Sequence, residues 1–262
     1  MSTFKSISLV KDQITENTTV VDLFSKNKNI VTPSVVLLGM LFISILIVSN
    51  IASFKVAEIF LTPSFAVTIP AALAFFPLTY FLDDVITEVY GFKMSRLVIW
   101  GGLLGSAVFT FCLWVAISLP ASPMWDNSTH GASAFDLVLN GSMRIFLASV
   151  IAYFCGEFLN SMVLAKLKVK TAGKKLYLRV LGGTVIGAAV DSTIFCSIAF
   201  WNVLPLLVIL KIILTLYIFK IAYDLFLLPV TYGLTTMLKK MDKVDYYDSR
   251  TTFNPFSLSL GN

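Results

Sequence analysis

Seven ionisable side chains lie inside stretches of the chain that are otherwise apolar, and their types and positions make them the first candidates for chemistry. They are Asp83, Asp84, Glu88, Glu157, Asp191, Lys220 and Asp224. A charged group at the depth of a bilayer costs a few kcal/mol, so such groups normally face the interior of a helix bundle or a wet cavity. These side chains therefore form the starting hypothesis for a functional site.

The composition excludes a soluble globular protein. Hydrophobic residues make up 57% of the 262 residues, charged residues only 13%, and the mean hydropathy is +0.84. So few charged side chains cannot cover the surface of a chain of this length in water. The chain is therefore predicted to have the lipid bilayer as its solvent and first partner.

Six apolar stretches are each long enough to cross the hydrocarbon core of a membrane, which needs about 20 residues per helix. The predicted spans are 33–54, 64–86, 95–119, 143–165, 180–202 and 206–238. The last is long for one untilted span, so its first residues are expected to form an interfacial or re-entrant turn. The predicted fold is an all-α polytopic membrane protein with six transmembrane helices, and a seventh crossing stays open.

Basic residues indicate which loops face the cytoplasm, because loops rich in Lys and Arg stay on that side. Sixteen of the 20 basic residues fall in the N-terminal segment, the second and fourth loops and the tail. Both termini are thus predicted to be cytoplasmic, around a transmembrane domain at 33–240 with a polar segment at 1–32 and a tail at 241–262. The net charge of +5 reflects this bias and does not indicate nucleic-acid binding.

Helical spacing brings some of the polar residues together. Asp84 and Glu88 are four residues apart on the second span, and Glu157 and Asn160 are three apart on the fourth, so each pair shares a helix face. Two carboxylates on one face repel each other unless a cation, a proton or a donor-rich ligand lies between them. Gly156, next to Glu157, could leave room there for a flat ligand.

Lys220 and Asp224, four apart on the last span, can pair with each other. Asp191 has no basic residue close in sequence and needs a partner from another helix. If Lys220 satisfies Asp224, then Asp84, Glu157 and Asp191 each hold a proton or await a donor. The buried charge therefore leans acidic.

A ligand rich in N–H groups would suit such a site. A guanine-type base offers a ring N–H beside an amino group, which one carboxylate accepts in bidentate fashion, while aromatic side chains stack on the ring. The composition admits this ligand without singling it out. One His, three scattered Cys and no paired nucleophile and base give no sign of a metal, a cofactor or an enzyme.

One run of residues resembles the signature of the queuosine precursor transporter family, also called the vitamin uptake transporter family. The run is Phe76-Pro77-Leu78-Thr79-Tyr80, then Asp84, then Thr87-Glu88-Val89-Tyr90-Gly91. The likeness continues from Arg144 to Lys166, through Asp191-Ser192-Thr193-Ile194-Phe195 and Ala199-Phe200, and on to Lys220 and Pro229. It covers roughly 50–238 of the chain.

The resemblance implies a multi-pass protein of the bacterial inner membrane that imports 7-deazaguanine precursors of the tRNA nucleoside queuosine. These are 7-cyano-7-deazaguanine, 7-aminomethyl-7-deazaguanine or queuine. The implied fold is similar to the substrate-binding subunits of energy-coupling-factor transporters. A coupling proton or sodium ion and a homo-oligomer stay open, as does the alternative of a substrate-capture subunit that needs a separate energising module.

The same resemblance implies where the substrate binds. The expected substrate-binding residues are Asp191, Glu157, Asn160, Asp84, Glu88, Lys220 and Asn50. Asp191 and Glu157 are expected to accept the N–H edge of the base, and Lys220 to supply a counter-charge. Alternating access around a site near the membrane midplane is the expected mechanism.

Overall fold

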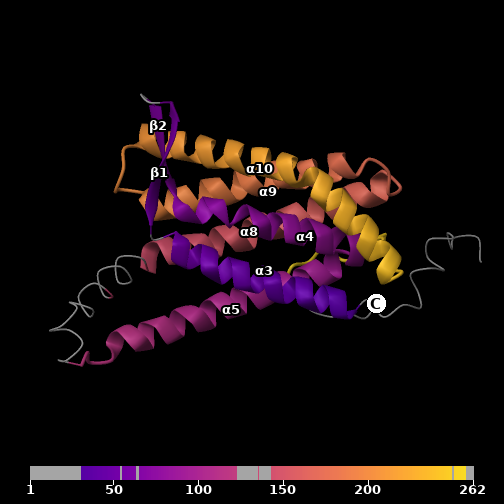
Figure 1. Cartoon of the computed structure of the whole chain (residues 1–262), viewed down its shortest axis with the longest axis horizontal. Helices are drawn as coiled ribbons and strands as arrows, with labels where there is room; N and C mark the ends of the chain where they lie inside the picture. Colours follow the sequence, from indigo (N-terminus) through magenta and orange to yellow (C-terminus); the bar gives the residue numbers. More distant parts are fainter. Residues whose placement is uncertain are drawn as a thin grey trace, which may run out of the picture.

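The computed structural model describes residues 31–53, 55–62, 65–122, 135, 143–249 and 251–257. Within them lie the helices α3 (Pro33–Ala52), α4 (Pro77–Tyr90), α5 (Phe92–Ser118), α8 (Met143–Lys170), α9 (Leu176–Phe200) and α10 (Leu206–Met241), the strands β1 (Val56–Thr62) and β2 (Phe65–Pro70), and the short 3-10 helix η1 (Ala71–Ala74). The helices run along the long axis of the molecule, and the β-hairpin stands at one end (Figure 1). Most of the predicted N-terminal segment, 1–30, lies outside the described residues.

In the described part of the chain, five helices are long and apolar enough to cross a membrane: α3, α5, α8, α9 and α10. They coincide, within a few residues at their ends, with five of the six predicted spans. Their outward faces carry large apolar side chains such as Leu104, Phe111 and Phe226, each more than 60% exposed, as lipid-facing helices require. The protein is therefore a multi-pass membrane protein.

The predicted helix at 64–86 is wrong. The chain there first forms the antiparallel hairpin of β1 and β2, in which Val56 pairs with Pro70 and Ile59 with Val67. It then turns through η1, and only α4, which is 14 residues long, is α-helical. Proline lacks a backbone N–H and clashes with the preceding turn of a helix, so the first helical position is the favoured place for Pro77.

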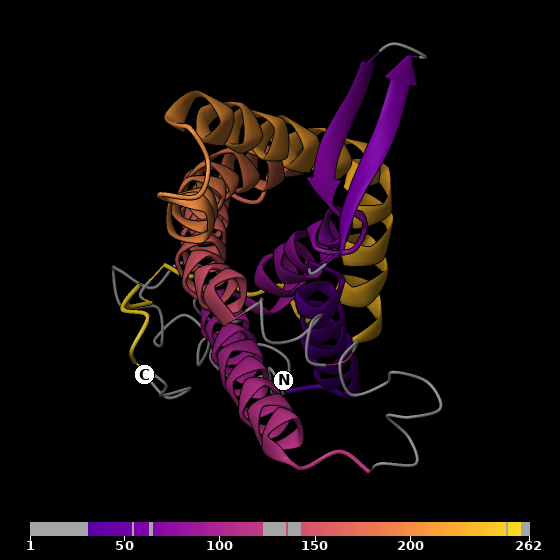
Figure 2. The same ribbon diagram turned by 90° about the vertical axis from the view of Figure 1, so that its left-hand side faces the viewer.

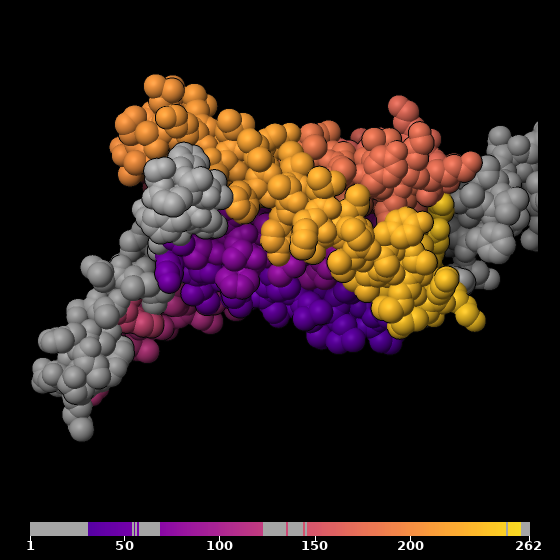
Figure 3. Space-filling view, turned by 45° about the horizontal axis from the view of Figure 1, so that its top comes forward, coloured from indigo at the N-terminus to yellow at the C-terminus, as the bar shows by residue number. Residues whose placement is uncertain are grey.

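The last apolar stretch is one continuous helix, so the expected turn at its start is also wrong. α10 extends for 36 residues and contains Pro229. Figure 2 shows that the helix changes direction along its length, between its orange and yellow parts. A proline inside a helix removes one backbone hydrogen bond and kinks the axis, which accounts for the bend. The space-filling view shows α10 lying across one face of the molecule, over α3 and α4 (Figure 3).

The two ends of the helical domain meet at the same end of the bundle. Thr32, just before α3, donates a hydrogen bond of 2.5 Å to Asp242, just after α10. Ser34 and Tyr90 donate to the same carboxylate at 3.0 and 2.6 Å. The start of α3, the end of α4 and the end of α10 therefore lie together at this end of the bundle.

Candidate functional site

A pocket of about 470 Å³, including the part that opens to the surface, lies in the half of the bundle nearest the hairpin. Its lining comes from the end of α3, from β2 and η1, and from α8, α9 and α10. The lining residues are Ser49, Asn50, Ser53, Pro70, Ala72, Leu73, Phe76, Ser149, Asp191, Phe195, Leu216 and Lys220. Three of the predicted site residues, Asn50, Asp191 and Lys220, therefore share one cavity.

Asp191 and Lys220 form a buried ion pair between α9 and α10. The expected partner of Asp191 from another helix is thus Lys220, and the alternative pair of Lys220 with Asp224 is wrong in this structure. The Lys220 ammonium also lies 4.9 Å from the centre of the Phe76 ring and 5.7 Å from that of Tyr80. A cation over aromatic faces is stabilised by their electron density, so this wall of the pocket is both aromatic and polar.

Asn50 is fixed in the pocket wall by hydroxyl groups from two other helices. Its amide nitrogen donates to Ser106 of α5 at 3.5 Å, and Ser149 of α8 donates to its oxygen at 2.8 Å. The side chain is 2% exposed. This arrangement orients the amide at the pocket.

Glu157 lies deeper in the bundle and is fully buried. Thr79 of α4 donates to one of its carboxylate oxygens at 3.0 Å, while the other oxygen has no hydrogen-bond partner among the described residues. The hydroxyl of the neighbouring Tyr80 is likewise buried without a hydrogen-bond partner among the described residues. Buried polar atoms are normally hydrogen-bonded, so each of these two atoms is an exception in the bundle interior.

Asn160 connects α8 to both aspartates of α4. Its amide nitrogen donates to Asp84 at 2.7 Å and to Asp83 at 3.4 Å. Ser95 and Ser161 each donate to Asp83 at 2.5 Å, so both oxygens of that carboxylate are occupied. Asp84 retains one oxygen with no partner among the described residues. Asp83 is therefore a packed structural carboxylate, whereas Asp84 is only half satisfied.

Asp224 of α10 is 3% exposed, and it faces the same interior as Asp84. Thr184 of α9 donates to one of its oxygens at 2.6 Å. The other oxygen has no partner among the described residues. Asp224 is not among the residues predicted to bind substrate, because its neighbour Lys220 offered a local partner in the sequence.

Glu88 lies apart from the pocket, in an ion cluster at the opposite end of the bundle. Arg179 donates to both of its oxygens, at 3.1 and 2.8 Å, and Lys239 lies 2.6 Å from one of them. Lys168 completes the cluster at 3.8 Å and bonds to the backbone oxygen of Glu88. Asp245 accepts from Lys168 and Lys239 at 2.6 and 3.0 Å. We call this end, which also holds the α8–α9 loop, the lysine-rich end.

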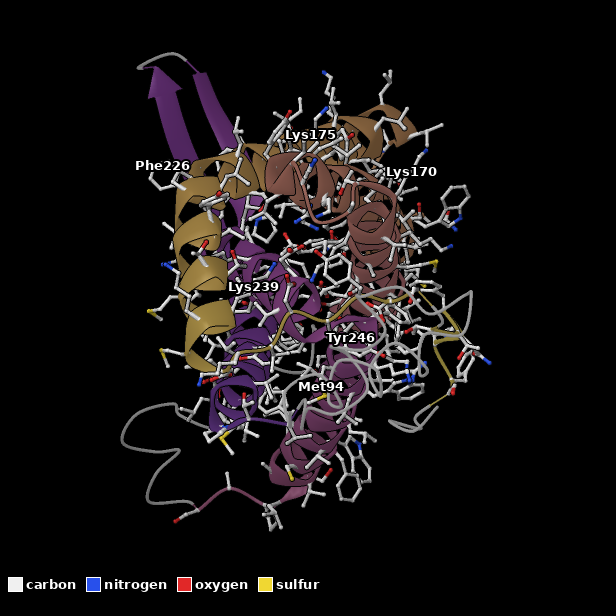
Figure 4. The ribbon with its side chains drawn as sticks, turned by 90° about the vertical axis from the view of Figure 1, so that its right-hand side faces the viewer. Met94, Lys170, Lys175, Phe226, Lys239 and Tyr246 are labelled. Carbon is white, nitrogen blue, oxygen red and sulfur yellow. The ribbon has the colours of Figure 1, made fainter. Side chains whose placement is uncertain are left out.

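The segment after α10 crosses the lysine-rich end (Figure 4). Tyr246 donates a backbone hydrogen bond to Val89 at 3.0 Å, and Asp248 accepts one from Phe92 at 2.9 Å. Trp100 donates to the backbone oxygen of Pro255 at 2.7 Å. We call residues 242–249 and 251–257 the strap, because they pack across the junction between α4 and α5.

One carboxylate of the strap has a lowered pKa. Burial raises the pKa of Asp245, but the nearby Lys168 and Lys239 lower it by more, so the pKa lies below its ordinary value. Such a group stabilises the folded state above its ordinary pKa and loses that contribution as the pH falls through its folded pKa. The Asp245 side chain is 42% exposed, so the contribution is small.

Sequence comparison decides the family. Residues 70–234, more than half of the chain, match the family described as "Putative vitamin uptake transporter". The chain belongs to this family. The resemblance drawn from the signature around Asp84 is therefore confirmed, and family membership supports transport and not enzymatic catalysis.

A curated relative is named more narrowly. The chain is 27% identical over 140 residues to the "Probable queuosine precursor transporter" of Bacillus subtilis (strain 168). The match covers 53% of this chain and 59% of the relative, so it spans about three fifths of that protein's length. No solved structure is significantly similar to this chain.

The region matched to the family contains most of the pocket and the deep carboxylates. Asp84, Glu157, Asp191 and Lys220 fall inside 70–234. Asn50 lies outside the matched region, as does the strap.

Gly156 holds α8 against α9 beside Asp191. A Cβ atom at this position would lie 2.6 Å from the Cβ of Asp191, 2.8 Å from the Tyr80 hydroxyl oxygen and 3.2 Å from the backbone oxygen of Gly187. The space beside Gly156 is therefore filled by protein, and the expected room for a flat ligand is absent there.

We expect Gly156→Ala to destabilise the protein by about 1–3 kcal/mol, because the added methyl group forces packed atoms apart. Thermal unfolding in detergent measures the change. Gly233→Ala on α10 is the matched control, since a Cβ there meets nothing within 4 Å. The close contact at Gly156 would be unimportant if both variants unfolded at the same temperature.

Proposed function

We propose that this protein imports 7-deazaguanine precursors of queuosine across the bacterial inner membrane. The candidates are 7-cyano-7-deazaguanine, 7-aminomethyl-7-deazaguanine and queuine. The observation that carries the proposal is a pocket that places the Asp191 carboxylate beside aromatic rings, in a multi-pass chain of the vitamin uptake transporter family. The similarity to a relative named as a queuosine precursor transporter narrows the substrate class.

The pocket has the groups that recognise a guanine-like edge. A carboxylate accepts two parallel N–H bonds, from the ring N–H and the exocyclic amino group, and Asp191 is the carboxylate in the wall. The Asn50 amide can donate to the ring carbonyl. Phe76 and Phe195 offer faces for stacking.

Lys220 must give way before Asp191 can bind the base. In this structure its ammonium occupies the carboxylate and lies over the Phe76 and Tyr80 rings. Those are the acceptor and the aromatic faces that a heterocycle would use. Lys220 therefore pairs with the carboxylate that the base needs, and the substrate must replace it.

Access to the pocket differs between the two ends of the bundle. The pocket lies toward the hairpin, whereas the Glu88 cluster and the strap close the lysine-rich end. With the basic loops in the cytoplasm, the pocket faces outward and the closed end faces inward. Alternating access then opens the lysine-rich end, and the substrate moves past Glu157, Asn160 and Asp84 to the cytoplasm. In this topology the chain makes six passes, and both termini are cytoplasmic.

Ligand binding to the purified protein tests the substrate class. We expect the three deazaguanines to bind at least tenfold more tightly than adenine, which presents no ring N–H beside its amino group; tenfold is about 1.4 kcal/mol. Isothermal titration over this panel, with guanine included, measures the preference. Equal affinity for adenine would contradict recognition by Asp191.

Expression of this protein alone separates the importer from the alternative, a capture subunit that needs an energising module. The host should lack its own queuosine synthesis and precursor uptake, and should have no coupling proteins. Queuosine reappearing in its tRNA on added precursor supports an unaided importer. Binding without restored queuosine supports the capture subunit.

A further inference from the structure

Two buried carboxylates of the bundle interior are each hydrogen-bonded through one oxygen alone among the described residues. Asp84 of α4 receives Asn160 on one oxygen, and Asp224 of α10 receives Thr184 on one oxygen. The second oxygen of each has no hydrogen-bond partner in the described part of the chain. The two groups are 0% and 3% exposed and close enough to repel each other electrostatically.

Among the described residues, no positive charge is paired with either carboxylate. The groups around them are Asp83 on α4, Glu157 and Asn160 on α8, and Thr184 on α9, with Lys220 one turn from Asp224 on α10. Among the described residues, no Lys or Arg forms an ion pair with Asp84 or Asp224, since Arg179 is bound to Glu88 and Lys220 to Asp191. Two ionised carboxylates in this dry setting are costly, so the pair holds a proton.

The cation that could replace this proton lies one helical turn away. Lys220 and Asp224 are four residues apart on α10, the spacing at which side chains on one helix face meet. The second oxygen of Asp224 could therefore serve as an alternative ion-pair partner for the Lys220 ammonium. The side-chain oxygen of Asn160 is also buried without a hydrogen-bond partner among the described residues. This part of the bundle interior therefore has more hydrogen-bond acceptors than donors.

We propose that Lys220 alternates between Asp191 and Asp224, and that its arrival at Asp224 releases the proton held by Asp84 and Asp224. Substrate N–H groups take the Asp191 carboxylate, the ammonium moves to the Asp224 carboxylate, and the proton leaves to solvent. In the reverse step, protonation of the pair returns Lys220 to Asp191 and expels the substrate. This mechanism rests on the proposed substrate pocket and adds to it a built-in competitor that promotes release.

The mechanism predicts that substrate and proton compete. For one proton, the affinity falls up to about tenfold for each pH unit of acidification, the equivalent of 1.36 kcal/mol. Titration of the full-length protein with 7-cyano-7-deazaguanine, in two buffers of different ionisation enthalpy, counts the protons released. The wild type should release close to one proton for each substrate bound, in the pH range where the pair is protonated.

Asp224→Asn is the decisive variant, because it removes the alternative carboxylate partner of Lys220 and leaves the pocket lining unchanged. It should bind substrate with an affinity that no longer follows pH, and release no proton. Asp83→Asn, the same change one residue from Asp84, is the matched control; both Asp83 oxygens are already occupied by hydroxyl groups, so its proton release should persist.

The wild-type measurement stands even if Asp224→Asn fails to fold. Substrate binding without proton release in the wild type would overturn the mechanism, as would proton uptake or an unchanged release in Asp224→Asn. Lys220→Met gives a second check, since without the ammonium binding should release no proton. Failure of every deazaguanine to bind the wild type would instead contradict the proposed function.

Discussion

Replacing Asp191 by Asn is expected to abolish uptake of 7-deazaguanines. The amide keeps the shape of the carboxylate but loses its charge and one of its two acceptor oxygens, so it cannot accept two N–H bonds from the base. Removing one partner of a buried, charge-assisted hydrogen bond costs about 2–5 kcal/mol, which weakens binding by roughly 30-fold or more. Binding of 7-cyano-7-deazaguanine and uptake into cells measure the loss.

The ion pair with Lys220 complicates this variant, and a second change separates the two effects. Asp191→Asn leaves the Lys220 ammonium buried without its carboxylate, which lowers stability for a reason unrelated to the substrate. Combining it with Lys220→Met removes that charge as well. The double variant should recover thermal stability but not binding, because the acceptor for the base is still missing.

Two results would remove Asp191 from the substrate site. One is uptake at the wild-type rate in Asp191→Asn. The other is binding that returns in the double variant together with its stability, because the single variant would then have failed through unfolding alone. The deeper carboxylate Glu157 would be the next candidate acceptor, since one of its oxygens is unoccupied.

The buried charges were the most informative part of the sequence, and the helices that hold them were mostly predictable. An acidic or basic residue in an apolar stretch must face the bundle interior, and all seven do so in the structure. Hydropathy located five spans, because a helix satisfies its own backbone in lipid and reads as a continuous apolar run. It failed at 64–86, where hydropathy does not distinguish an apolar hairpin and a short helix from one span.

The pairing of the buried groups could not be predicted, because it depends on which helix faces lie together. Lys220 has a sequence neighbour in Asp224 but bonds to Asp191, 29 residues away. Ser95 and Ser161, which hold Asp83, are ordinary polar residues without a signal of their own. The excess of Lys and Arg in one set of loops also hides the structural role of two of these residues.

Lys168 and Arg179 count toward the positive loops, but each is only 1% exposed. Both bind Glu88, which the sequence places with the substrate-binding residues. The structure gives Glu88 a different environment, with three basic side chains around one carboxylate. A structural role and a substrate-binding role for Glu88 predict different effects when this residue is replaced.

Glu88→Gln is expected to destabilise the protein by about 3–5 kcal/mol, because breaking a buried ion cluster leaves unpaired charges in a dry site. Arg179 would lose its bidentate partner, and Asp245 would be the one carboxylate left to Lys168 and Lys239 among the described residues. The yield of folded protein and its thermal unfolding in detergent measure the effect. Asp245→Asn is the matched control in the same cluster; its side chain is 42% exposed, so a loss below about 1 kcal/mol is expected.

The position of Glu88 relative to the pocket makes this test decisive for its role. The carboxylate lies at the lysine-rich end, and the pocket at the hairpin end, so neutralising Glu88 should leave the affinity of the remaining folded protein for 7-cyano-7-deazaguanine unchanged. The opposite pattern, wild-type stability with lost binding, would place Glu88 in the substrate site. It would also mean that Arg179 and Lys239 do not depend on this carboxylate, against the geometry in which three cations converge on it.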